Sequence, residues 1–197
     1  MLRLRCLSLV TALLIPIPLA AEKLVLELDP RQTAIEFTFG ATLHTVKGSL
    51  SLTLGRIEVD PEAGTADGRI VMSATSADTG NSRRDAKMHE KILESERYPN
   101  IVFDVERVTG TLKRSGRSEL QLHGRLDFHG SRHQVAVPAV ANVQGGQVTA
   151  EAYLIVPYVE WGLADPSFFI LRVAKEVRVD IRTAGRLLHP EAGAAPH

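Results

Sequence analysis

Three histidines lie close together in the second half of the chain, and they are the first residues whose chemistry suggests a function. They are His123, His129 and His133, and the first two are six positions apart, which gives them the same parity in a strand. Imidazole is a good ligand for zinc and copper, so a surface metal site is one interpretation. The other is that these side chains share the polar outer face of strands with Arg125. We favour this second interpretation and predict no metal site.

Two consecutive arginines follow Ser82, where we expect a helix to begin. Free backbone N–H groups and the helix dipole favour an anion at such a position. The arginine side chain matches the geometry of phosphate with two parallel hydrogen bonds. Arg83 or Arg84 is therefore a candidate to receive a phosphate or pyrophosphate group. Asp85 would oppose an anion, and a plain solvated first turn is the alternative interpretation.

The motifs of the common catalytic sites do not occur in this sequence. It contains no Gly-x-Ser-x-Gly motif, no His-Glu-x-x-His motif and no glycine loop of the kind that cradles phosphate. The only cysteine, Cys6, lies in a segment that we expect to be removed, so the mature chain would have neither a thiol nucleophile nor a disulfide. We therefore predict a binding protein and not an enzyme.

Large apolar side chains are spread along the chain at positions that we expect to converge on one interior. A core is the ordinary role of each of them alone. The stretch at 148–154 turns mostly small residues to the same face, which suggests room for a long apolar ligand. Together with the two arginines and with His44, expected at a rim, they give our candidate ligand-binding residues: Phe37, Phe39, His44, Arg83, Arg84, Met88, Phe103, Tyr153, Trp161 and Phe168.

The elements that position these residues are mostly strands, because apolar and polar residues alternate with a period of two. Such alternation marks 35–39, 46–54, 101–105, 120–128, 148–154 and 177–181, with Leu54 on the apolar face. The short connections favour antiparallel pairing. We predict an all-β fold, an eight-stranded antiparallel lipocalin-like barrel, with a two-layer sandwich as the alternative. We also expect a helix over about 82–94, capped by Ser82, and a short second helix over about 166–172 that begins at Asp165-Pro166.

The N-terminus predicts export. Arg3 and Arg5 precede an apolar run that ends near Leu19-Ala20-Ala21, which is typical of a secretory signal peptide. A membrane anchor is the alternative. We expect a signal peptide over 1–21, one domain over 22–186 and a disordered tail over 187–197. Loss of the two arginines leaves 21 basic and 23 acidic residues, without the basic block of a nucleic-acid-binding protein. The expected location is the periplasm.

The order and spacing of several short motifs resemble the YceI-like family of exported lipocalin-like proteins that bind polyisoprenoids. The resemblance extends over about 28–185. It rests on Phe37-Thr-Phe-Gly-Ala-Thr-Leu-His44, Val46-Lys-Gly48, Val59-Asp-Pro61, Asp78-Thr-Gly80, Arg84-Asp85, Met88-His89, Tyr98-Pro-Asn-Ile-Val-Phe103, Leu122-His-Gly124 and the stretch 177–181. The segments 157–162 and 165–172 depart from the family pattern.

The resemblance implies an eight-stranded barrel with a helix near its mouth and no catalysis. It implies that the barrel holds a long-chain isoprenoid lipid, of the polyprenyl phosphate or quinone type, for transport or sequestration, in a role connected with stress. No other cofactor is expected. Transient contact with a membrane and a homodimer are both compatible with the sequence. The alternative function is a non-catalytic interaction module with a filled core and no ligand.

Overall fold

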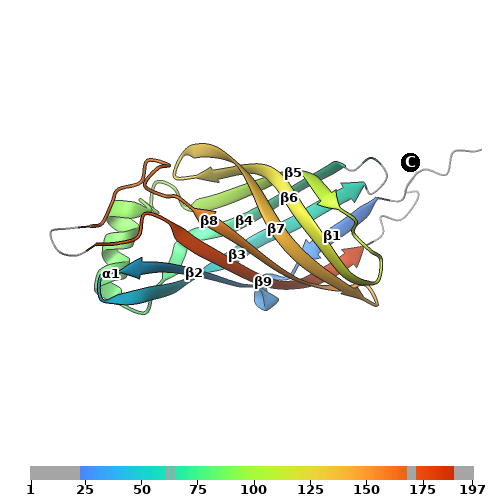
Figure 1. Ribbon diagram of the computed structural model, residues 1–197, viewed down its shortest axis with the longest axis horizontal. Helices are drawn as coiled ribbons and strands as arrows, with labels where there is room; N and C mark the ends of the chain where they lie inside the picture. The colour runs from blue at the N-terminus through green and yellow to red at the C-terminus, as the bar shows by residue number, and fades with distance from the viewer. Residues whose placement is uncertain (1–22, 61–62, 64, 168–171, 189–197) are drawn as a thin grey trace, which may run out of the picture.

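The computed structural model describes residues 23–60, 63, 65–167 and 172–188 of the 197-residue chain (Figure 1). Strands account for most of this part. The elements are β1 (Leu24–Leu28), the 3-10 turn η1 (Pro30–Gln32), β2 (Ala34–Ala41), β3 (His44–Asp60), β4 (Thr65–Asp78), α1 (Ser82–Lys87), the π-helical turn η2 (Met88–Ile92), β5 (Asn100–Gly110), β6 (Gly116–Phe128), β7 (Ser131–Gln144), β8 (Gln147–Val156) and β9 (Val177–Leu188).

The strands form one closed antiparallel sheet, in the order β1-β3-β2-β9-β8-β7-β6-β5-β4 with additional pairing of β3 with β4 and of β1 with β9. Both β1 and β2 lie between β3 and β9. The first pairs with 56–59 of β3, and the second pairs with 44–50. β1 and β2 therefore occupy the same place in the barrel between β3 and β9, one after the other along β3, with η1 between them. The predicted eight-stranded barrel is confirmed, and a closed sheet of this kind excludes the two-layer sandwich.

The barrel has two unlike ends, which we name by their elements. The α1 end carries α1 and η2, the β2–β3 and β6–β7 hairpins and the β8–β9 connection. The far end carries the β7–β8 hairpin, the β5–β6 connection and the start of β1 (Figure 1). Because neighbouring strands are antiparallel, every second connection returns to the same end. Connections that are distant in sequence therefore lie together, either at the α1 end or at the far end.

A bulge in β3 changes which of its residues face the interior. Leu50 and Leu52 pack in the core, and the register with β4 then shifts between Leu52 and Leu54. Beyond the shift, Ile57 and Val59 face inward, whereas 47 % of Leu54 is exposed. The prediction that Leu54 shares the apolar face was wrong, because one extra residue in a strand moves every following side chain to the opposite face.

The predicted helix is present, but its cap differs from the expectation. Asn81, and not Ser82, is the N-cap residue, and its side-chain oxygen accepts a hydrogen bond from the Arg84 backbone N–H at 3.1 Å. The α-helix then continues into the π-helical turn, which places Ile92 and Leu93 against the core. An asparagine side chain caps a helix as well as a serine does, so the predicted cap was wrong by one residue.

The short second helix expected over 166–172 is not formed by the residues of that stretch that the structure describes. Pro166, Ser167 and Arg172 lie in irregular chain, and 168–171 lie outside the described residues. The Ser167 N–H donates to Asp165 Oδ1 at 2.9 Å. The Arg172 N–H donates to Thr42 Oγ1 at 2.6 Å. Both N–H groups thus donate to side-chain oxygens, one in the same turn and one in a neighbouring hairpin.

The structure describes the C-terminal end of the predicted domain but not the signal peptide predicted before the domain. The last strand continues to Leu188, and Leu187 is 7 % exposed and pairs with Leu26. The domain therefore extends two residues beyond the boundary expected at 186, because burial of Leu187 holds the end of β9 in the barrel. The predicted signal peptide and residues 189–197 lie outside the described residues. No helix in the described ranges has the length and apolar character needed to cross a membrane.

Candidate ligand-binding site in the barrel interior

Most inward side chains of the barrel are apolar. A core cluster with Ile35, Phe103 and Leu126 among its buried members fills much of the space. Other inward side chains that contact this cluster are only half-buried, whereas the interior of a protein is normally closely packed. The half-buried inward residues that contact this cluster include Leu50, Ile70, Leu122, Leu154, Val179 and Ile181.

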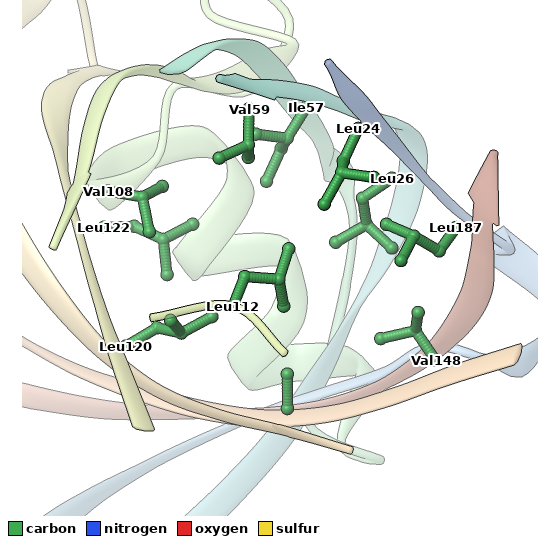
Figure 2. Close-up of a pocket in the computed structure, with 11 residues that line it drawn as sticks. Leu24, Leu26, Ile57, Val59, Val108, Leu112, Leu120, Leu122, Val148 and Leu187 are labelled. Atoms are coloured by element: carbon green, nitrogen blue, oxygen red, sulfur yellow. The ribbon is translucent and has the colours of Figure 1, made fainter. Parts of the chain in front are cut away.

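A small cavity lies at the far end. Its volume is about 40 Å³ and its lining is wholly aliphatic. Figure 2 shows Leu112, from the β5–β6 connection, in the middle of a ring that includes Leu24 and Leu187. A volume of this size accommodates roughly one to three water-sized groups. The far-end cavity is therefore too small for an isoprenoid chain, and none of the ligand-binding residues expected from the sequence lines it.

The α1 end is aromatic. Trp161 follows β8 in the loop that enters this end, and its ring stacks on His133 with centroids 4.0 Å apart and planes 9° apart. Phe128 meets the same indole edge-on at 6.4 Å. Offset and edge-on arrangements of this kind are the favourable ones for aromatic rings. Trp161 and Phe128, which come from different elements, thus form one apolar surface at the α1 end.

A buried tyrosine anchors the connection between β8 and β9. The Tyr158 hydroxyl donates to the Ala174 carbonyl oxygen at 2.9 Å, and the side chain is 6 % exposed. Burial, with a smaller contribution from the negative charge of Asp165, raises the pKa of Tyr158 to about 12. The chain at Val173 and Ala174 is held to the β2–β3 hairpin, since Ala41 pairs with Val173 and the Ala174 N–H donates to the Gly40 carbonyl oxygen at 2.8 Å. Hydrogen bonds therefore hold both described parts of the β8–β9 connection.

Phe37 and Phe39 lie on the inward face of β2 near the α1 end, as expected. Their rings are stacked, with centroids 6.4 Å apart and planes 3° apart. Gly48 lies opposite Phe37 in the sheet, and a Cβ atom there would lie 2.2 Å from Phe37 Cζ. Because Gly48 has no Cβ atom, the Phe37 ring has room to lie against this strand. Phe103 is also inward and buried, but it belongs to the middle of the core.

The two arginines at the start of α1 differ in what they contact. Arg84 Nε donates to Thr79 Oγ1 at 2.7 Å, and its terminal nitrogen donates to the Thr79 carbonyl oxygen at 3.0 Å. Arg83 is exposed and has no ion pair with the described residues. Burial acts to raise the pKa of Asp85, but hydrogen bonds from Thr79 and Asn81 outweigh it and hold this pKa below its usual range. Arg84 therefore stabilises the loop, and Arg83 is the cation available to an anion.

The remaining expected site residues are dispersed. Met88 is half-buried at the start of the π-helical turn, and His44 is exposed on the β2–β3 hairpin at the rim, where we expected it. The expected inward position of Tyr153 is wrong. Its neighbours Ala152 and Leu154 take the inward positions of β8, so Tyr153 is 43 % exposed, with the Arg178 guanidinium 4.6 Å from its ring centroid. Phe168 lies outside the described residues.

The three histidines do not form a common site. His123 lies on the outer face beside Thr109, with Nε2 3.1 Å from Thr109 Oγ1. His129 Nε2 lies 3.2 Å from Glu94 Oε1, and His133 is stacked on Trp161. Within the ranges that the structure describes, no group of three or more His, Cys, Asp or Glu side chains is placed to hold a metal ion. The alternative of a shared site at the three histidines is thus not realised.

Comparison with known proteins agrees with this geometry. The model of the YceI-like domain matches residues 26–184. The chain belongs to the YceI-like family. No curated protein matches it significantly. Among solved structures, BcnA of Burkholderia cenocepacia has a TM-score of 0.64 at 15 % identity, over 80 % of this chain and 98 % of that one.

Two further solved structures show the same fold. One is a polyisoprenoid-binding domain from Saccharophagus degradans, described as implicated in plant cell wall breakdown. Its TM-score is 0.59 at 15 % identity, over 84 % of this chain and 98 % of that one. The other is the YCEI protein of Campylobacter jejuni, with a TM-score of 0.59 at 13 % identity, over 77 % of this chain and 88 % of that one. At such identities the likeness establishes the fold alone.

Two features of this YceI-like barrel were missed in the sequence. One is the inward position of His133, although it stands two and four residues before Val135 and Val137 on β7, which face the core. The period of two was a signal for it, but the polar side chain favoured the outer face. The other is Leu112, an aliphatic residue in a connection that showed no strand pattern. No local signal indicated that it would fold back over the far end.

Proposed function

We propose that the protein is a periplasmic, non-catalytic lipid-binding protein that holds a long-chain isoprenoid in its barrel, for transport or sequestration. The observation that carries this proposal is the apolar middle of the barrel, where inward leucines such as Leu50 and Leu154 are only half-buried. Burial of apolar ligand surface is favourable by about 25 cal/mol per Å² before the costs of association. An apolar chain therefore has a binding energy available here without any charged contact.

The family supports the chemical class of the ligand. The Saccharophagus degradans structure is described as a polyisoprenoid-binding domain, and its barrel superposes on most of this chain. Isoprenoid chains are branched and narrow, which suits a lining of leucine, isoleucine and valine. A polyprenyl phosphate and a quinone are both compatible with such a tail. Of the two arginines expected to receive a phosphate, the exposed Arg83 at the α1 end is the one that a phosphate head would reach from solvent.

A second candidate is a non-catalytic interaction module with a filled core. The observation that favours it is the small volume of the far-end cavity, about 40 Å³. A ligand chain must then lie in the middle of the barrel and displace half-buried side chains, whereas an interaction module needs no such space. The two candidates therefore differ in whether the interior opens.

The test is native mass spectrometry of the protein from a periplasmic extract prepared without detergent, followed by extraction and identification of the lipid. A co-purified isoprenoid of defined mass is the expected result, and its head group would separate the phosphate from the quinone. A protein of apo mass that also fails to take up added geranylgeraniol, a neutral C20 isoprenoid alcohol, would favour the interaction module. Recovery of the protein only from the cytoplasm would contradict the location.

A further inference from the structure

One nitrogen atom at the α1 end is buried without a partner. His133 Nε2 is inaccessible to water and makes no hydrogen bond with the described residues. The side chain cannot easily turn away, because its ring lies flat on the Trp161 indole with centroids 4.0 Å apart. A buried polar atom without a hydrogen bond is unfavourable and is rare in folded proteins. Such an atom at the inner mouth of an apolar barrel indicates a partner that arrives from outside the chain.

The position of His133 places this atom next to the space that we propose for the lipid. His133 shares the inward face of β7 with Val135 and Val137, and it lies opposite the buried Leu126 of β6. Trp161 and Phe128 complete the surroundings of the ring. A head group that stops beside His133 would leave its tail free to extend toward the middle of the barrel.

The surroundings of His133 favour an uncharged head group. The next residue, Arg132, lies on the outer face, where its Nε donates to Asp127 Oδ1 at 3.0 Å. Arg83 is exposed at the start of α1, outside this aromatic surface. Neither arginine would pair with a phosphate beside His133, and desolvation of that charge is strongly unfavourable. A carbonyl or hydroxyl oxygen requires only the one hydrogen bond that Nε2 offers.

We propose that His133 Nε2 forms a hydrogen bond with a neutral oxygen of the bound isoprenoid, and that this contact selects carbonyl or hydroxyl head groups over phosphorylated ones. The proposal rests on the proposed function and names the head group of that same ligand. Trp161 supports the contact by holding the imidazole plane. It is also the only tryptophan of the chain, so its fluorescence reports on this position alone.

The test uses three C20 probes with comparable chains: geranylgeraniol, geranylgeranyl diphosphate and the corresponding saturated hydrocarbon, phytane. Calorimetry gives the dissociation constants, and Trp161 fluorescence shows whether the probe reaches the α1 end. The variant His133→Phe keeps a stacked ring and removes the nitrogen, and His133→Gln keeps a hydrogen-bonding side chain. His123→Phe is the matched control, because His123 lies on the outer face beside Thr109.

We expect wild type to bind the alcohol more tightly than the diphosphate, with a change in Trp161 emission. His133→Phe should weaken the alcohol roughly three- to tenfold, the usual value of one hydrogen bond, and leave the hydrocarbon within about twofold. His133→Gln should recover part of the loss, and His123→Phe should bind like wild type. An equal effect of His133→Phe on alcohol and hydrocarbon, or none on the alcohol, would overturn the role of His133 and leave lipid binding standing. Tighter binding of the diphosphate would overturn the selectivity. If none of the probes binds wild type, the proposed function fails and this role fails with it.

Discussion

The two ends of the barrel are built from different chemistry. The far end encloses a cavity of about 40 Å³ with a wholly aliphatic lining, in which Leu112 meets residues of β1 and β9 (Figure 2). The α1 end brings together stacked aromatic rings, an unpartnered imidazole nitrogen and the exposed Arg83. Aliphatic packing is sufficient for stability, whereas buried polar atoms are costly unless they are hydrogen-bonded. We therefore propose that the far end holds the barrel together and that the α1 end receives the ligand.

Packing at the far end should therefore control stability and not binding. Leu24 is 1 % exposed in the far-end cluster, and Leu24→Ala should lower the free energy of unfolding by about 3 kcal/mol, as other buried leucines do when truncated. Urea unfolding measures this loss, with Leu54→Ala on the outer face as the control, expected within about 0.5 kcal/mol of wild type. The isoprenoid dissociation constant of the folded variant should not change. A tenfold weaker affinity at full folding would contradict the division between the ends.

The α1 end should be sensitive to added volume under Phe37. Gly48→Ala places a Cβ atom 2.2 Å from Phe37 Cζ and 2.6 Å from the Asp78 carbonyl oxygen, so one of the two must shift. We expect a loss of about 2 kcal/mol in thermal or urea unfolding. Gly40→Ala in the same hairpin is the control, since the nearest atom to its new Cβ is Ala174 Cβ at 4.0 Å. Equal stabilities of the two variants would show that Phe37 is not fixed on this strand.

The anchor of the β8–β9 connection gives a smaller effect and a dependence on pH. Tyr158→Phe leaves the Ala174 carbonyl oxygen without its donor and should cost about 1 kcal/mol at pH 7. In wild type, burial raises the pKa of Tyr158 from 10.0 to about 12. Between these values the folded state keeps a proton that the unfolded state releases, so this contribution is complete below about pH 10 and is lost as the pH rises toward 12.

Urea unfolding at pH 8 and at pH 11 checks both statements. Wild type should lose more stability over this interval than Tyr158→Phe does. Tyr153→Phe, at an outer-face position that is 43 % exposed, should follow wild type. If Tyr158→Phe shows the same decline as wild type, the hydroxyl does not titrate as its burial requires.

Period-two alternation was enough to predict the barrel, because one buried face fixes the register of each strand. The prediction failed where one extra residue in a strand reverses the alternation of inward and outward side chains. The bulge after Leu52 moved Leu54 to the outer face, and nothing in the local composition marks that bulge. Phe37, Phe39 and Trp161 of the predicted site all lie at the α1 end, and their role in binding stays a prediction.

Single side chains within that site were harder to predict. Tyr153 was assigned to the interior by its apolar ring although the parity of Ala152 and Leu154 placed it outside. His133 was assigned to the outside by its polarity although the parity of Val135 placed it inside. In both cases the position in the strand outweighed the character of the side chain. Arg84 shows a different limit, because its hydrogen bonds to Thr79 depend on a loop geometry that spacing does not specify.

The central claim is that the isoprenoid lies inside the barrel, and methyl NMR with labelled leucines tests it most directly. Geranylgeraniol should shift the methyl signals of the inward leucines in the middle of the barrel, Leu50 and Leu154. The outward Leu43 and Leu54, which are 88 % and 47 % exposed, should not move. Shifts confined to Leu43 and Leu54, with the inward leucines unchanged at saturating alcohol, would contradict the claim and place the lipid on the surface.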